Sequence, residues 1–193
     1  MLQHKKHVTK NITNRYSMTI GQSKSLKEHA MRFGTAMGIF WIFKFIFLPL
    51  GFKVPFLQLL FVILTCAVPF LGYRYARTYR DKYCGGELPF IRAYSFLMLM
   101  YFFAALLTSV VHFTYFNFID NGFITETYLA QLETLKSNVT GEMETSVDQL
   151  METFNLIASL SPIQLTLQLI FQNIFYGSLL ALPTALFVMK RKK

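Results

Sequence analysis

The chain is poor in cysteine and in charged residues of either sign. Only two of its 193 residues are cysteines, Cys66 in an apolar segment and Cys84 in a basic loop. Two thiols at different depths are not expected to form a disulfide, and neither has a second cysteine or a paired histidine at metal-ligand spacing. We therefore expect no disulfide, no metal site and no cofactor.

Catalytic signatures are also missing from the sequence. It contains no His-Glu-x-x-His, no Gly-x-Ser-x-Gly and no nucleotide-binding loop. Its apolar segments hold no paired carboxylates, and a mid-membrane Asp or Glu is the usual device of a proton-coupled transporter. These absences predict a protein that is not an enzyme and has no catalytic residues.

What the chain has in excess is apolar surface. Hydrophobic residues make up 53% of it and charged residues 15%, against about 25% charged in soluble domains. Four apolar stretches each reach the length of about 20 residues that a membrane-crossing helix needs. We predict an all-α polytopic integral membrane protein with four transmembrane helices, at residues 30–50, 55–73, 91–119 and 162–189.

These spans form one predicted transmembrane domain, residues 30–189, between two basic ends. Residues 1–29 are a polar, basic segment, with Met1 and Met18 as alternative starts of translation, and residues 190–193 are a basic tail. Ser25 to Glu28 spells S-x-x-E, the spacing of a capping box. The first helix is therefore expected to begin there, after a lead without regular structure.

The net charge of +9 gathers at the edges of the apolar segments, which favours a membrane over a nucleic-acid partner. Of the nineteen Lys and Arg residues, only Lys44, Lys53 and Lys136 lie outside three blocks: the N-terminal residues through Arg32, the loop at 73–92 and the tail. Seven of the ten acidic residues lie in 120–161. Basic residues in short loops stay in the cytoplasm. Both termini and the 73–92 loop are thus predicted to be cytoplasmic, with residues 120–161 outside.

The outer segment, residues 120–161, is too long for a plain turn. Its apolar residues recur at helical spacing on either side of Gly141, which predicts two short amphipathic helices. Basic residues are nearly absent from it, so attraction to anionic lipid is not its expected purpose. The alternatives are a cap over the outer mouth of the bundle and a face presented to a partner.

Polar side chains within apolar spans are costly and mark candidate sites. The candidates for an outward-facing polar cleft are Lys44, Gln58, His112, Gln164, Gln168 and Gln172. The alternative interpretations are that these side chains hydrogen-bond helices together, that Gln164 only caps the last span, and that Lys44 snorkels to the surface. If Lys44 is held in the cleft, Asp120 is its expected partner.

Small residues recur every fourth position in the first and last spans. They are Ala30, Gly34 and Gly38 in the first and Gly177, Ala181 and Ala185 in the last. Such stripes let helix backbones approach closely. We predict that the first and last spans pack against each other through them.

The chain resembles an uncharacterised family of small bacterial inner-membrane proteins. The resemblance rests on the four-span layout, on the long polar insert, and on Tyr79-Arg80-Asp81-Lys82 followed by Gly85-Gly86. The family is a domain of unknown function, and the resemblance covers residues 25–190. It implies location in the bacterial inner membrane and assigns no activity. Arg77, Arg80 and Asp81 are candidate contacts for lipid headgroups or a partner, with a positive-inside turn as the alternative.

These observations favour a non-enzymatic accessory or assembly protein for another membrane component. The alternative is a small transporter or lipid-handling protein that uses the outward-facing polar cleft. The expected partners are the lipid bilayer and either another membrane protein or a second copy of the chain, with no nucleic acid.

Overall fold

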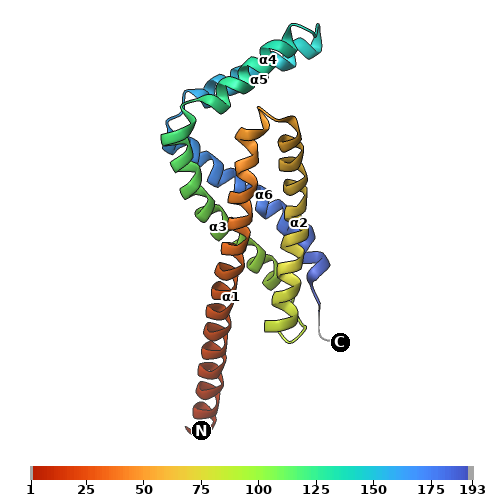
Figure 1. The fold of residues 1–193 in the computed structure, drawn as a ribbon. Coiled ribbons are helices and arrows are strands. Elements are labelled where there is room, and N and C mark those ends of the chain that lie inside the picture. Colours follow the sequence, from red (N-terminus) through yellow and green to blue (C-terminus); the bar gives the residue numbers. More distant parts are fainter. Residues whose placement is uncertain (1, 191–193) are drawn as a thin grey trace.

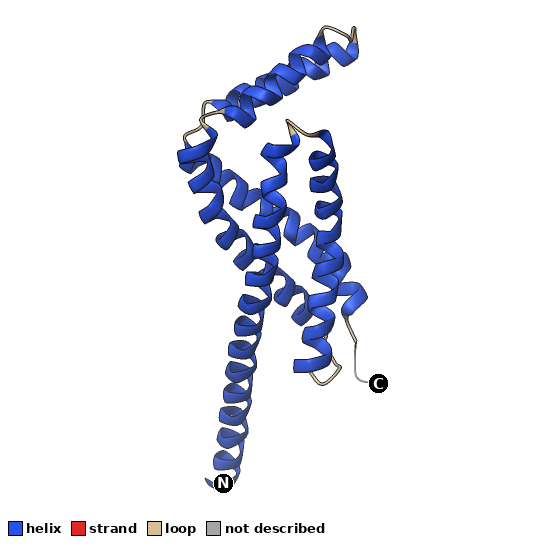
Figure 2. Ribbon diagram, viewed as in Figure 1, coloured by secondary structure: helices blue, strands red, loops and turns tan. Residues whose placement is uncertain are grey.

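The computed structural model describes the backbone of residues 2–190 and the side chains of residues 25–190. In this range all regular elements are helices joined by short loops (Figure 2). They are α1 (Leu2–Gly51), α2 (Pro55–Tyr83), α3 (Phe90–Tyr115), the π-helical turn η1 (Phe116–Asp120), α4 (Phe123–Lys136), α5 (Glu142–Ala158) and α6 (Pro162–Val188).

Four of these helices contain stretches long and apolar enough to cross a membrane, namely Ser25–Gly51, Pro55–Tyr83, Phe90–Asp120 and Pro162–Val188. The prediction of an all-α, four-span membrane protein is confirmed. The second helix continues ten residues past its predicted end at residue 73, because no proline or glycine interrupts it before Gly85. Gly85 and Gly86 then take positive φ values of 64° and 83°, which reverse the chain towards α3.

The first helix starts earlier than predicted. α1 begins at Leu2, so the expectation of a lead without regular structure before Ser25 is wrong. The sequence contains no proline and no glycine before Gly21, and nothing in it stops a helix from extending backwards from the first span. As a result, α1 projects well beyond the other helices at its N-terminal end (Figure 1).

The third span is the centre of the bundle. α3 packs against α1 and against α6, while α2 packs against α1 and α6 (Figure 1). Because α3 has neighbours on two sides, its buried residues cover more than one face; they are Ala93, Phe96, Leu97, Met100, Tyr101, Ala104, Ala105, Thr108 and His112.

Both small-residue stripes face α3. A Cβ added at Gly34 would lie 2.7 Å from the carbonyl oxygen of Met100, and one added at Gly177 would lie 2.8 Å from Cβ of Tyr101. The prediction that the first and last spans pack against each other through their stripes is therefore wrong. A small-residue stripe permits close approach of a neighbouring helix and does not specify which helix it is.

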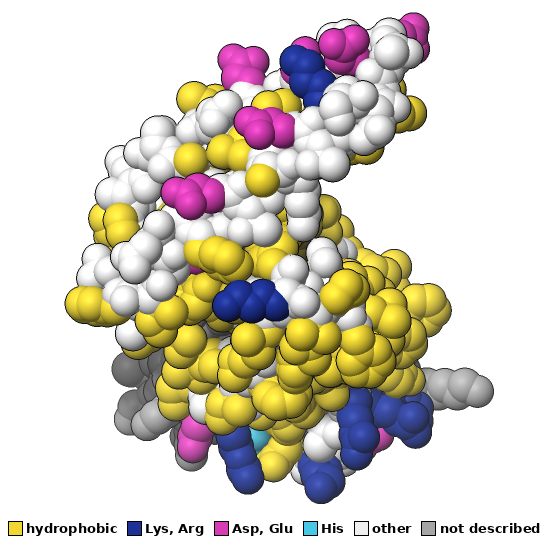
Figure 3. All heavy atoms as spheres, turned by 45° about the horizontal axis from the view of Figure 1, so that its top comes forward, with side chains coloured by type: hydrophobic (Ala, Val, Ile, Leu, Met, Phe, Trp, Pro, Cys, Tyr) yellow, Lys and Arg dark blue, Asp and Glu magenta, His cyan; other side chains and the backbone are white. Residues whose placement is uncertain are grey.

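The segment between α3 and α6 forms a helical hairpin, and its predicted division at Gly141 is confirmed. Tyr128 of α4 packs against Phe154 of α5 with ring centroids 5.1 Å apart. Lys136 pairs with Asp148 at 2.5 Å, and the hydrogen bond to that carboxylate raises the pKa of Lys136 above its ordinary value. The hairpin lies over one end of the bundle (Figure 1), and Figure 3 shows acidic side chains on it and most visible Lys and Arg at the opposite end.

Candidate functional site

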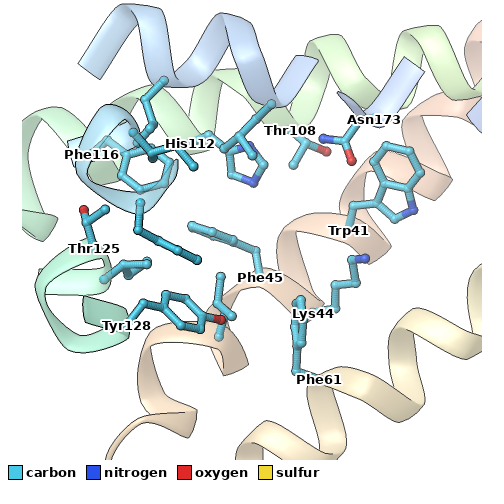
Figure 4. Close-up of a pocket in the computed structure, with 16 residues that line it drawn as sticks. Trp41, Lys44, Phe45, Phe61, Thr108, His112, Phe116, Thr125, Tyr128 and Asn173 are labelled. Carbon is cyan, nitrogen blue, oxygen red and sulfur yellow. The ribbon is translucent and has the colours of Figure 1, made fainter. Parts of the chain in front are cut away.

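A cavity of about 250 Å³ lies beneath the α4–α5 hairpin, between α1, α3 and α6 (Figure 4). Its walls are mostly aromatic and aliphatic. The polar side chains that reach it are Lys44, Thr108, His112, Thr125, Tyr128 and Asn173. The cavity therefore combines an apolar lining with a few hydrogen-bonding groups, which is the usual composition of a small-molecule site.

The sequence builds this cavity from rings on different helices. Phe45 of α1 lies against His112 of α3, with ring centroids 4.4 Å apart, and meets Tyr115 edge-on at 5.3 Å. Tyr128 reaches in from the hairpin and packs against Phe52, in the turn after α1, with ring centroids 5.0 Å apart. Burial raises the pKa of Tyr128 above its ordinary value. These contacts hold the hairpin over the cavity.

A second cavity, of about 470 Å³, lies between α2 and α6 and is also mainly apolar. Trp41, Lys44 and Asn173 line both cavities. Lys44 thus stands at their junction. Trp41 and Lys44 are three residues apart on α1, which places them on the same side of that helix.

Lys44 has no carboxylate partner among the described residues. Its Nζ donates a hydrogen bond to Thr65 Oγ1 of α2 at 3.3 Å and lies 5.4 Å from the ring centroid of Phe61. Asp120 is occupied elsewhere, since its Oδ1 accepts a hydrogen bond from the backbone N–H of Ile124 at 3.2 Å. The expected pair between Lys44 and Asp120 is therefore not formed.

The indole N–H of Trp41 is buried and has no hydrogen-bond acceptor in the described part of the chain. The ring is held in place by stacking on Tyr101 of α3, with centroids 6.0 Å apart. The ammonium of Lys44 lies near Trp41 (Figure 4), with Nζ 5.9 Å from the centroid of the indole ring. A buried donor left without an acceptor costs about 1–3 kcal/mol. The Lys44 ammonium, which lies where the two apolar cavities join, is suited to bind an anionic or acceptor group.

Of the six cleft candidates, the structure brings Lys44 and His112 to the same cavity. Gln58, Gln164, Gln168 and Gln172 line neither cavity. Gln58 packs against Gly51 at the turn between α1 and α2. Gln164 completes a capping box at the start of α6, where its Oε1 accepts hydrogen bonds from the N–H and hydroxyl of Ser161. Gln168 and Gln172 are exposed on α6.

Three polar residues that line the cavities, Trp41, Thr65 and Asn173, were not predicted from the sequence. The sequence contained an indication for Trp41 and for Asn173. Trp41 is the only tryptophan of the chain and shares a helical face with Lys44, and Asn173 is an amide within an apolar span. The placement of Thr65 opposite Lys44 depends on how α1 and α2 pack, which helical spacing does not determine.

The candidate contacts in the α2–α3 connection have different roles. Arg80 is only 15% exposed and donates hydrogen bonds to the Val188 carbonyl at 2.9 Å and to Asp81 at 2.7 Å. Leu88 and Lys190 exchange two backbone hydrogen bonds of 2.9 Å beside it. Arg80 and Asp81 thus fasten the end of α6 to this connection. Arg77 is 59% exposed and lies 3.6 Å from Asp81, so it remains accessible to a headgroup or partner.

Within the described residues, no group of three or more His, Cys, Asp or Glu side chains is placed to hold a metal ion. Four apolar spans, a hairpin over one end and a largely apolar cavity beneath it define a small polytopic membrane protein. The chain belongs to the family described as Protein of unknown function (DUF4199), whose family model matches residues 32–190. The resemblance to an uncharacterised four-span family is thereby confirmed. Comparison with curated proteins and with solved structures found no match.

Proposed function

We propose that the chain is a non-enzymatic lipid-handling protein that binds an amphiphile with an anionic head at Lys44 and Trp41. The observation that carries the proposal is the Lys44 ammonium, which has no carboxylate partner among the described residues and lies near the Trp41 ring at the junction of two apolar cavities. A carboxylate or phosphate would pair with the Lys44 ammonium, and charge-assisted hydrogen bonds of this kind are the strong ones.

The apolar part of such a ligand has a path along the bundle. The α2–α6 cavity is followed by a groove of about 460 Å³ that shares Pro69 and Leu180 with it and reaches Phe187. An acyl chain with its head at Lys44 therefore fits between α2 and α6. Because the groove is as apolar as lipid, we expect the head to determine which amphiphile binds.

The single tryptophan provides a direct test. Trp41 is the only tryptophan in the sequence, so a brominated fatty acid that binds at Lys44 should quench the whole intrinsic tryptophan emission in a saturable manner. Lys44→Met removes the charged donor and should weaken the apparent affinity by on the order of tenfold or more, because a hydrogen bond to a charged group contributes roughly 1.5–3 kcal/mol.

Lys53→Met is the matched control, since Lys53 is exposed in the turn after α1 and lines neither cavity. It removes the same charge and should leave the titration unchanged. Brominated phosphatidylglycerol and phosphatidylcholine, compared in the same assay, distinguish a free fatty acid from an anionic phospholipid as the ligand. Quenching that does not saturate, or that is equal in the Lys44→Met and native proteins, would contradict the proposal.

We also propose that the protein lies in the bacterial inner membrane with both termini in the cytoplasm and the hairpin outside. The separation of basic and acidic residues supports this orientation. In a Cys66→Ser background, a membrane-impermeant maleimide should label Ser137→Cys in intact cells. It should label the native Cys84 only after permeabilisation. Labelling of position 137 solely from the inside would show the opposite orientation.

An accessory or assembly role is the second candidate, and the hairpin is the feature that favours it. Leu135, Met143 and Leu150 on α4 and α5 are 46–60% exposed, which suits contact with another membrane protein. Met143→Asn and Leu150→Asn should then abolish co-purification of a stoichiometric membrane protein while leaving fatty-acid quenching intact. If the variants retain all co-purifying proteins, the hairpin is not the docking surface.

A further inference from the structure

Two glutamines face away from the bundle within the apolar part of α6. Gln168 and Gln172 are exposed, and they lie about 9 and 15 Å along the helix from Pro162 at 1.5 Å per residue. Gln164, one turn earlier, uses its side chain to cap the helix. By contrast, neither Gln168 nor Gln172 forms a side-chain hydrogen bond to another described residue.

The rest of α6 prevents these amides from turning inwards. The side of the helix that packs on α3 carries Gly177 and Ala181, which are buried. The glutamines lie on the roughly opposite side, next to Phe171 and Phe175, which are 68% and 58% exposed. Gln168 and Gln172 therefore form a polar strip on the outer surface of the bundle, with aromatic side chains beside it. The strip lies at a depth where lipid would otherwise cover it.

An amide in contact with hydrocarbon loses the hydrogen bonds that it makes in water, which is unfavourable unless another protein group replaces them. A glutamine amide carries two donors and an acceptor and no charge, so two glutamines can bond to each other without repulsion. In the proposed orientation, all copies of the chain insert in the same direction. Two α6 helices that meet as parallel neighbours therefore present Gln168 and Gln172 at equal depths.

We propose that this strip is a self-association interface, in which two copies of the chain pair α6 with α6 about a two-fold axis along the membrane normal. Gln168 then bonds to Gln168 of the second copy and Gln172 to Gln172, as a two-fold interface requires, with Phe171 and Phe175 packing beside them. The interface is separate from the cavities, because neither glutamine lines them.

Association is measured by energy transfer between donor- and acceptor-labelled copies in liposomes that contain no other protein, over a series of protein-to-lipid ratios. The double change Gln168→Leu and Gln172→Leu should weaken dimerisation by on the order of tenfold, because two interhelical hydrogen-bonded pairs contribute about 0.6 kcal/mol each. Asn117→Leu is the matched control. It replaces an exposed amide on η1 by the same residue and should leave the dimer unchanged.

Cross-linking locates the interface independently. In a background with Cys66→Ser and Cys84→Ser, Gln168→Cys should form a disulfide-linked dimer on oxidation. Phe56→Cys, at a position that is also exposed (69%) but lies on α2, should not. A monomer at every protein-to-lipid ratio, unchanged association in the double leucine variant, or equal cross-linking at both positions would overturn the proposal. Saturable quenching of Trp41 should persist in the leucine variant, so failure of the dimer is distinguishable from failure of the lipid site.

Discussion

Gly34→Ala is expected to destabilise the bundle more than its small change in volume suggests. The new Cβ would lie 2.7 Å from the carbonyl oxygen of Met100 and 2.7 Å from Cβ of Phe103. These atoms belong to the backbone of α3 and to the first atom of a side chain, so no change of rotamer relieves the overlap and the two helices must move apart. We expect a loss of about 3 kcal/mol, which corresponds to a fall in Tm of roughly 6–12 °C for a chain of this size.

Thermal unfolding in detergent, followed by scanning fluorimetry, checks this expectation. Ala36→Leu is the control on the same helix, because Ala36 is exposed and a larger side chain there meets no neighbouring helix. Gly38→Ala should fall between the two, since the nearest atom to its Cβ, at 3.0 Å, is the flexible end of Leu107. Equal melting temperatures for Gly34→Ala and the native protein would mean that α1 and α3 are not in close contact.

The places where helices begin and where the chain turns can be predicted from the sequence. Local signals predict local structure well. Ser161, Pro162 and Gln164 place the start of α6 where the structure has it, because a capping box involves only residues of one helical turn. In the same way, Gly141 divides the hairpin because its positive φ of 70° suits glycine.

The choice of packing partners is not local. The stripes of α1 and α6 look complementary in the sequence, yet each packs on α3, whose buried face includes Met100, Tyr101 and Ala104. Spacing within one helix identifies a face and leaves open which of the other helices covers it. The central position of α3 follows from the joint packing of all four spans.

The outward position of Gln168 and Gln172 could have been predicted by comparing them with the small residues on the same helix. Gln168 and Gln172 were expected to line a cleft because polar residues in a span usually face protein. The same helix carries Gly177 and Ala181, and helical geometry places these on the roughly opposite side. Since a small-residue stripe marks the side that packs, the glutamines had to face away. By contrast, Lys44 and His112 reach one cavity through the packing of α1 on α3, which no pattern in either helix determines.

Gly72→Ala and Tyr101→Phe should be strongly coupled. Gly72 of α2 packs directly on the Tyr101 hydroxyl, so a Cβ at position 72 would overlap Oη, whereas the next atom of the ring, Cζ, would lie at 3.3 Å. The ring cannot move aside, because Trp41 stacks on it and Gly177 contacts its Cβ. Gly72→Ala alone is therefore expected to cost about 3 kcal/mol, at the upper end of the range for overpacking.

Tyr101→Phe removes the atom responsible for that overlap. The Tyr101 hydroxyl is also buried without a hydrogen-bond partner among the described residues, so its removal should be neutral or stabilise the protein by about 1 kcal/mol. In the Tyr101→Phe background, Gly72→Ala should then be tolerated, with a coupling free energy of about 2–3 kcal/mol between the two sites. Denaturation midpoints of the four proteins of this cycle measure the coupling. Equal destabilisation by Gly72→Ala in both backgrounds would mean that α2 does not rest on the Tyr101 hydroxyl, and the close approach of α2 to α3 at Gly72 would be wrong.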